Sequence, residues 1–420
     1  MVAMKRLSLL LTFFAISISL TSCGKSFFQL NAGESDRIVL RVWEGSKGAD
    51  EFIRAAARDY RMLHGDVDFI VETVEPSEVL YQLSVDLPRD EAADIFCATS
   101  DMIPFLVEND LICEIKDLSN TGTAFLSHCI EDVSYRGKKY GAPVSIETNL
   151  LYYNRSLIHE NEVPKTWGEM MTRCRKFNIK NPDKKALVFN ARDGFVALSF
   201  ATQGKSGIFF SREDGSVSIN RDGYVDFGMD FLKKFRPYLD VDADEMNGEY
   251  VRDMFRTGRA AMVITDSSDV RIFEDAPVNF GVTVLPGFAN ENQEFPLSTY
   301  RRTRGMFVSS ASKHYDKACS FVKYVASADM QQKRFSFTGA VPAVELELKN
   351  PVVKLSKKQL PETIALPKNP AMPSVWESMN SACEKIWEGK NSGGVLDEVS
   401  ALLSRLQNLE ADAETECLDK

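Results

Sequence analysis

Three arginines in four residues form the group of side chains with the clearest binding chemistry in this sequence. They lie in the segment Tyr300-Arg301-Arg302-Thr303-Arg304-Gly305. A guanidinium group is a planar fork of donors that matches a carboxylate or a phosphate. The segment therefore predicts either a binding site for an anionic group or ion pairs with the acidic side chains of a chain whose net charge is −10. For the first interpretation, Arg304 is the best candidate.

Polar side chains also follow several predicted strands. Glu44, Ser46 and Lys47 come after the strand at 38–42. Asp101 follows the strand at 94–97, and Asp266 and Ser268 follow a strand that ends at residue 265. Loops at the carboxyl ends of strands are where open α/β sheets bind ligands. The alternative for these residues is a solvated turn.

Several other chemistries have no support in the sequence. The histidines are scattered, and neither a GxSxG nor a CxxC motif occurs, so a catalytic triad and a zinc site are not indicated. The acidic net charge argues against nucleic acid as a partner. We therefore expect no cofactor, no metal and no nucleic acid.

The N-terminus predicts export. Lys5 and Arg6 precede an apolar run, 7–20, which is short for a membrane span and has the layout of a signal peptide. The run ends in Leu20-Thr21-Ser22-Cys23-Gly24, which resembles the bacterial lipobox. That resemblance implies a signal peptide over 1–22 and a lipid on Cys23. Residues 23–37 would form a polar tether, and the lipid would hold the domain on a membrane without spanning it.

The other cysteines number seven, an odd count, so at least one is unpaired. Several lie in apolar runs, such as Ile95-Phe96-Cys97-Ala98. We interpret them as small buried hydrophobic side chains in preference to a disulfide framework.

The order of predicted elements indicates an α/β fold. Strands are predicted at 38–42, 67–74, 94–97 and 150–153, with a helix at 50–63 capped by Asp50. This alternation favours a largely parallel sheet covered by helices. Two capping boxes, Thr166-Trp167-Gly168-Glu169 and Ser374-Val375-Trp376-Glu377, predict helix starts in the more helical remainder of the chain.

Seven segments, in the same order and spacing, resemble the solute-binding proteins of ABC sugar importers, the maltodextrin-binding family in particular. They are Val42-Trp43-Glu44-Gly45-Ser46-Lys47-Gly48, Ala93-Asp94-Ile95-Phe96, Tyr140-Gly141-Ala142-Pro143-Val144, Leu151-Tyr152-Tyr153-Asn154-Arg155, Pro164-Lys165-Thr166-Trp167-Gly168-Glu169, Phe255-Arg256-Thr257-Gly258-Arg259-Ala260-Ala261-Met262 and Phe280-Gly281-Val282-Thr283-Val284-Leu285-Pro286. The resemblance implies two discontinuous α/β lobes, joined by a hinge, with the ligand in the cleft between them. The first lobe would comprise 38–143 plus 286–325, and the second 145–285 plus 327–412.

The resemblance also implies which residues bind the ligand. Carboxylates would accept hydrogen bonds from the sugar hydroxyls, and aromatic rings would stack on the sugar. Trp376 would form such an aromatic platform at a helix start. The expected ligand-binding residues are Glu44, Ser46, Lys47, Asp101, Glu147, Asp193, Phe195, Asp266, Ser268, Arg304 and Trp376. The sequence departs from the maltodextrin binders at Ala98, where they carry tryptophan, at Met102, where they carry arginine, and in the loop after Thr265.

The resemblance implies an extracytoplasmic lipoprotein, periplasmic or on the cell surface, that captures a sugar or oligosaccharide. It would act as a monomer, without catalysis, and deliver the ligand to an ABC permease by hinge closure. The alternative is an exported glycosidase in which Asp101, Glu147, Asp193 and Asp266 would supply paired carboxylates. A third possibility, a structural lipoprotein, would have no need of such residues in a cleft.

Overall fold

The structure is a computed structural model that describes residues 37–418, except 46–47, 119–121, 213–214, 242–244 and 290–293. In the last helix it describes side chains up to Leu409. The predicted signal peptide, Cys23 and nearly all of the tether lie outside the described residues. So do two of the expected ligand contacts, Ser46 and Lys47.

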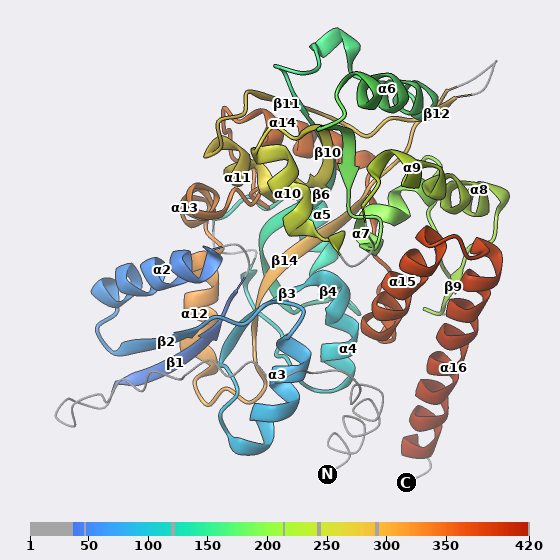
Figure 1. Ribbon diagram of the computed structural model, residues 1–420. Helices are drawn as coiled ribbons and strands as arrows, with labels where there is room; N and C mark the ends of the chain where they lie inside the picture. Colours follow the sequence, from blue (N-terminus) through green and yellow to red (C-terminus); the bar gives the residue numbers. More distant parts are fainter. Residues whose placement is uncertain are drawn as a thin grey trace.

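One mixed sheet runs through the described part of the chain (Figure 1). Its strands are β1 (Ile38–Trp43), β2 (Val67–Glu72), β3 (Ile95–Thr99), β6 (Gly141–Asn154), β7 (Lys185–Phe189), β10 (Ala260–Asp266), β11 (Phe280–Thr283), β14 (Tyr300–Val308) and β15 (Ile364–Ala365). The main path is β2-β1-β3-β14-β6-β10-β7, with β11 beside β6 and β15 beside β14. The predicted α/β class is confirmed.

Strand β6 joins the two halves of this sheet. Its residues 141–148 pair with β14, and its residues 149–154 pair with β10 and β11. Strands β1, β2 and β3 are parallel, as are β7 and β10, and β14 and β15. Strand β6 runs antiparallel to β14, β10 and β11, and β14 runs antiparallel to β3. The largely parallel sheet that we predicted is therefore correct only within each half. Apolar patterning reports whether a strand is buried and carries no information on its direction.

Helices cover both halves of the sheet. Those of the first half are α2 (Ala49–Leu63), α3 (Val79–Asp86), α4 (Ile103–Glu108), α5 (Ser127–Asp132), α12 (Tyr315–Val325) and α13 (Ala328–Thr338). The second half carries α6 (Trp167–Lys180), α7 (Gly194–Ala197), α8 (Gly223–Leu232), α9 (Arg236–Leu239), α10 (Gly248–Arg256), α11 (Val270–Glu274), α14 (Pro351–Gln359), α15 (Met372–Trp387) and α16 (Ser392–Leu418). Figure 1 shows α2 and α12 beside β1 and β2, away from α6, α8 and α16.

The helix starts test three sequence predictions. The capping box at α6 is confirmed, because Thr166 Oγ1 accepts from Glu169 N and Glu169 Oε2 accepts from Thr166 N. The box at Ser374 is wrong: α15 begins at Met372 without a side-chain cap, since Pro373 fits the first turn of a helix. Asp50 does not cap α2 either, because Gly48 holds that position.

Three tryptophans and most of the described cysteines pack in the hydrophobic cores, which confirms the prediction made for the cysteines. Trp43, Trp167 and Trp387 are 1%, 0% and 2% exposed. The six cysteines whose side chains the structure describes are unpaired, and five of them are buried. Burial raises the pKa of the Cys129 and Cys174 thiols to about 12, so both stay protonated and behave as hydrophobic side chains.

Helix α8 approaches the short helix η6 (Leu198–Ala201) so closely that only a glycine fits at residue 228. A Cβ added to Gly228 would lie 1.9 Å from the carbonyl oxygen of Phe200. Gly228→Ala is therefore expected to lower the free energy of unfolding by about 1–3 kcal/mol, because the backbone must move. Gly223 on the same helix has open space around a Cβ. Gly223→Ala is the matched control and should leave stability unchanged or slightly higher. Urea unfolding measures both, and equal stability of the two variants would contradict close packing at Gly228.

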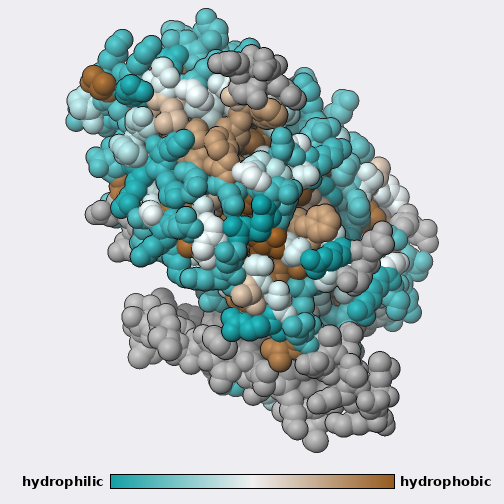
Figure 2. Space-filling model, turned by 90° about the vertical axis from the view of Figure 1, so that its right-hand side faces the viewer, coloured by the Kyte–Doolittle hydropathy of each residue, from teal (hydrophilic) through white to brown (hydrophobic). Residues whose placement is uncertain are grey.

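The surface seen from the side of α8 and α16 is mostly hydrophilic, with hydrophobic side chains in several separate areas (Figure 2). Phe227 on α8, which is 50% exposed, packs edge-on against Phe288 with ring centroids 5.1 Å apart. Separate exposed hydrophobic side chains are normal on a folded domain. Among the described residues, no helix combines the length and the apolar composition needed to cross a membrane.

Candidate ligand-binding site

The arginine segment forms part of β14, where it runs antiparallel to β6. Arg302 lies opposite Glu147, and Arg304 lies opposite Ser145. Side chains alternate between the two faces of a strand, so Arg302 and Arg304 share one face with Glu147 while Arg301 and Thr303 share the other. The segment is thus divided between two different environments.

On the first face, Glu147 binds both arginines. Its Oε2 accepts from Arg302 Nε at 3.0 Å, and its Oε1 accepts from Arg304 Nε. Glu147 is 3% exposed, so these are buried, charge-assisted bonds. Of the two predicted roles for the arginines, pairing with acidic side chains is therefore realised. Each oxygen of Glu147 already accepts from an arginine, so this carboxylate is not poised as the proton donor of a glycosidase.

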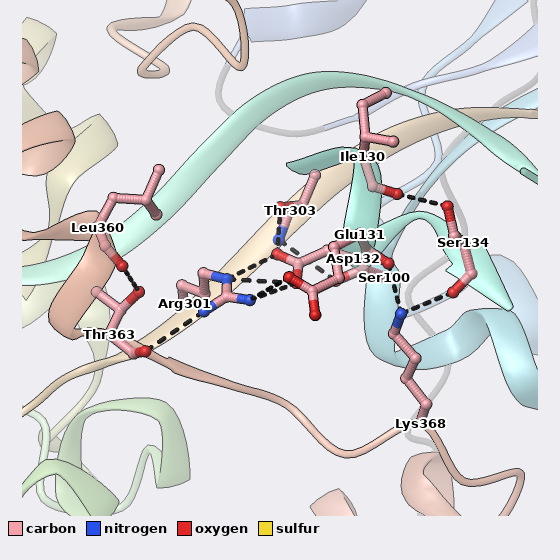
Figure 3. Close-up of polar contacts among 10 residues, drawn as sticks. All are labelled: Ser100, Ile130, Glu131, Asp132, Ser134, Arg301, Thr303, Leu360, Thr363 and Lys368. Carbon is pink, nitrogen blue, oxygen red and sulfur yellow. Dashed lines mark hydrogen bonds and ion pairs between the residues drawn. The ribbon is translucent and has the colours of Figure 1, made fainter. Parts of the chain in front are cut away.

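On the opposite face, Arg301 and Thr303 both bind Asp132 of α5 (Figure 3). Arg301 donates from Nε at 3.1 Å and from Nη2 at 3.0 Å, and Thr303 Oγ1 donates at 2.8 Å. Arg301 Nη1 reaches the carbonyl oxygen of Thr363 at 3.3 Å. Arg301 and Asp132 are 6% and 4% exposed. This network fastens β14 to α5 and to the chain beside β15, and we assign it a structural role.

Arg302 also contacts the second half of the molecule. Its guanidinium carbon lies 4.4 Å from the ring centroid of Phe195, a cation–π contact. The pKa of Arg302 is raised: burial acts to lower it, but Glu147, and behind it Asp101 and Asp266, stabilise the cation more strongly. Asp101 follows β3 in the first half, and Asp266 follows β10 in the second. Groups from both halves of the molecule therefore surround Arg302.

Two of the expected contacts cap short helical turns of the second half. Asp193 Oδ1 accepts from the backbone N–H of Phe195 at the start of α7. Asp266 Oδ1 accepts from the backbone N–H of Ser268 at the start of η9 (Ser267–Asp269). Phe195 and Ser268 are buried. These carboxylates are held in place by backbone donors at helix starts.

Asp101 lies in η3 (Ser100–Met102) and is 6% exposed. Its Oδ1 has no hydrogen-bond partner among the described residues. A buried carboxylate oxygen without a donor is costly, which makes it a candidate acceptor for a ligand hydroxyl. Helix α15, which carries Trp376, contacts η3, so the two halves meet close to Asp101.

Trp376 lies beside α7. A Cβ on Gly194 would come within 3.0 Å of the indole ring, and the ring of Phe209 meets it edge-on at 5.9 Å. The indole is only partly buried. Asp193, Phe195 and Trp376 therefore gather in one place, although they come from positions far apart in the sequence.

Glu44 is fully buried, and its Oε2 accepts from Arg334 Nη2 of α13 at 3.0 Å. Arg334 is itself 1% exposed, with its guanidinium 5.6 Å from the ring of Phe52. Burial raises the pKa of the nearby Cys97 thiol, and the negative charge of Glu44 raises it further, whereas Arg334 acts to lower it.

Within the described ranges, no group of three or more His, Cys, Asp or Glu side chains is placed to bind a metal ion.

Comparison with known proteins identifies the family of this chain. The family model for bacterial extracellular solute-binding proteins matches residues 55–373. The chain belongs to this family. Its predicted relationship to the solute-binding proteins, and the two-lobe fold that goes with it, are thus confirmed.

Curated relatives of this solute-binding protein span nearly its whole length. A galactooligosaccharide-binding protein of Bacillus subtilis (strain 168) is 27% identical, covering 92% of this chain and 93% of the relative. A maltodextrin-binding protein of the same organism is 25% identical, covering 93% and 95%. A maltooligosaccharide ABC transporter solute-binding lipoprotein of Streptococcus pneumoniae serotype 4 (strain ATCC BAA-334 / TIGR4) is 23% identical, covering 89% and 90%.

Among solved structures, a cyclo/maltodextrin-binding protein complexed with maltotetraose matches the fold of this solute-binding protein. The TM-score is 0.70 at 22% sequence identity, and the match covers 89% of this chain and 98% of the other. At this identity the likeness supports the fold. The ligand of the present chain has to be argued from its own side chains.

Sequence reasoning missed three residues in or beside the candidate site of this solute-binding protein. Arg302 lay in the arginine segment but was not singled out, although alternation along a strand puts it on the same face as Arg304. Asp132 and Arg334 carried no local signal. Each is recognisable only once β14 or β1 has been placed beside it.

Proposed function

We propose that this protein is the capture component of an ABC importer for a carbohydrate, anchored outside the cytoplasm by a lipid on Cys23. One observation carries the proposal: side chains from both halves of the sheet meet at β6 and β14 and are buried there. Glu147, Phe195 and Asp101 are 3%, 4% and 6% exposed. A ligand can reach such residues only if the two halves separate, which is the behaviour expected of a hinged binder.

The hinge in this proposal consists of three chain segments that connect the halves. They are β6, β14 and the segment around Val341, which bridges to Ile146. The proposed lobes are 38–143 plus 286–325 and 145–285 plus 327–412. We move α13 to the first lobe, because Met330 packs in the same core as Phe52 and Phe321. The ligand would bridge the lobes and shift the population toward the closed form.

The residues of the proposed site are those predicted from the sequence: Glu44, Ser46, Lys47, Asp101, Glu147, Asp193, Phe195, Asp266, Ser268, Arg304 and Trp376. We propose different roles within this set. Asp101 and Trp376 would contact the sugar directly, as hydroxyl acceptor and aromatic platform. Glu147 would hold Arg302 and Arg304 in position, and Glu44 would hold Arg334.

The lipid anchor would keep the proposed receptor, a monomer, near its permease. The tether 23–37 restricts it to a thin layer at the membrane surface, which raises its local concentration. The relatives that bind galactooligosaccharides and maltooligosaccharides support a carbohydrate ligand, and the lipoprotein among them supports the anchor.

Calorimetry against mono- and oligosaccharides, with chromatography of the same samples, tests the proposal. We expect stoichiometric binding without products, and small-angle scattering should show compaction when a sugar binds. Released hydrolysis products would indicate the glycosidase instead. A bound sugar without any compaction would contradict the hinge.

A further inference from the structure

The first face of β14 holds two guanidiniums against one carboxylate. Two guanidiniums, Arg302 and Arg304, share the single carboxylate of Glu147. Both arginines are largely withdrawn from water, with side chains 28% and 12% exposed. The other carboxylates near these arginines are Glu44, which pairs with Arg334 at 3.0 Å, and Glu75, Asp101 and Asp266.

One guanidinium nitrogen on this face lacks a hydrogen-bond acceptor among the described residues. Arg304 Nη1 is buried and has no hydrogen-bond partner among the described residues. Leaving a charged donor buried without an acceptor is costly, and a neutral acceptor compensates less than a charged one. An incoming group with a negative charge would satisfy this donor.

Two carboxylates beside the arginine pair form the acceptor side of the site. Asp101 has a buried oxygen without a donor among the described residues, and Asp266 lies at the start of η9 in the other half. Both act electrostatically on Arg302, so they lie near the arginine pair. A ligand that fits this arrangement needs an anionic group at one position and hydroxyl donors at another.

We propose that the ligand is an acidic sugar, either a hexuronic acid or an oligosaccharide that contains one. Its carboxylate accepts from Arg304 Nη1, next to the charge of Arg302, and a ring hydroxyl donates to Asp101. This inference rests on the proposed function and narrows it from carbohydrates to sugar acids.

The test uses paired ligands that differ only at one carbon. Hexuronic acids of galacto, gluco and manno configuration, as monomers and short oligomers, are compared by calorimetry with the neutral hexoses of the same configuration and linkage. We expect at least one acid to bind about a hundredfold more tightly than its neutral counterpart, which is typical of a buried, hydrogen-bonded charge pair. Equal affinities, or binding of neutral sugars alone, would overturn the acidic ligand and leave the carbohydrate receptor intact. Binding of neither class would overturn both proposals.

A substitution of Arg304 tests whether the carboxylate of the ligand binds at this residue. Arg304→Gln leaves Glu147 paired with Arg302 alone, which is a balanced pair, so the fold should persist with little change in melting temperature. Its affinity for the acid should fall about a hundredfold, and by a much larger factor than its affinity for the neutral sugar. The control is Arg61→Gln, an arginine of α2 that is 53% exposed and pairs with Asp68. Unchanged acid binding by Arg304→Gln, or an equal loss for both ligand classes, would refute the assignment of Arg304.

Discussion

Asp132→Ala is expected to lower the free energy of unfolding by about 3–5 kcal/mol, the usual cost of removing one partner of a buried ion pair. Asp132 accepts from two nitrogens of Arg301 and from Thr303 Oγ1 (Figure 3). Without it, the guanidinium of Arg301 would stay buried in the middle of the sheet. It would keep the carbonyl oxygen of Thr363 as a hydrogen-bond acceptor and, 3.9 Å away, the mostly exposed carboxylate of Glu131. Chemical denaturation monitored by tryptophan fluorescence measures the loss.

An exposed ion pair gives the matched control for Asp132. Lys385 and Glu398 join α15 to α16 at 2.9 Å with side chains 46% and 67% exposed. Glu398→Ala should cost less than about 1 kcal/mol, because water screens the pair and solvates the remaining lysine. If Asp132→Ala cost no more than Glu398→Ala, the network would not be what fastens β14 to α5.

Glu44→Ala should destabilise the fold by a similar amount, about 3–5 kcal/mol. The reason is that Arg334, on a helix almost 300 residues away in sequence, would be left 1% exposed without its carboxylate. Arg334 Nε and Nη1 already have no partner among the described residues, so little remains to compensate its charge. This expectation contrasts with the sequence-based role of Glu44 as a direct ligand contact, which predicts lost binding at unchanged stability.

A double variant separates the two roles of Glu44. Glu44→Leu combined with Arg334→Met removes both charges and should recover most of the lost stability, because well-packed apolar groups often replace a buried pair at little cost. Asp59→Ala, which breaks the exposed pair between α2 and Lys333 of α13, is the control and should cost less than about 1 kcal/mol. Additive losses in the double variant would contradict a direct pairing of Glu44 with Arg334.

The local features of this fold were readable from the sequence. Strand β1 and helix α2 follow from apolar spacing, and the start of α6 follows from Thr166 and Glu169, whose side chains bond within one turn of the same helix. The burial of Trp43, Trp167 and Trp387 follows from side-chain chemistry. The seven ordered segments carried the family assignment, although periodicity alone could not have placed the crossings of the chain.

What the sequence left open was the partner of each charged group. The arginine segment allowed either a ligand anion or internal ion pairs, and only the pairing of β14 with β6 showed Arg302 and Arg304 sharing Glu147. Asp132 and Arg334 were invisible because they lie about 170 and 290 residues from the groups they bind. A side chain's local sequence sets which charge it carries. Tertiary structure decides whether that charge is paired, because strand register and chain crossings bring the counterions together.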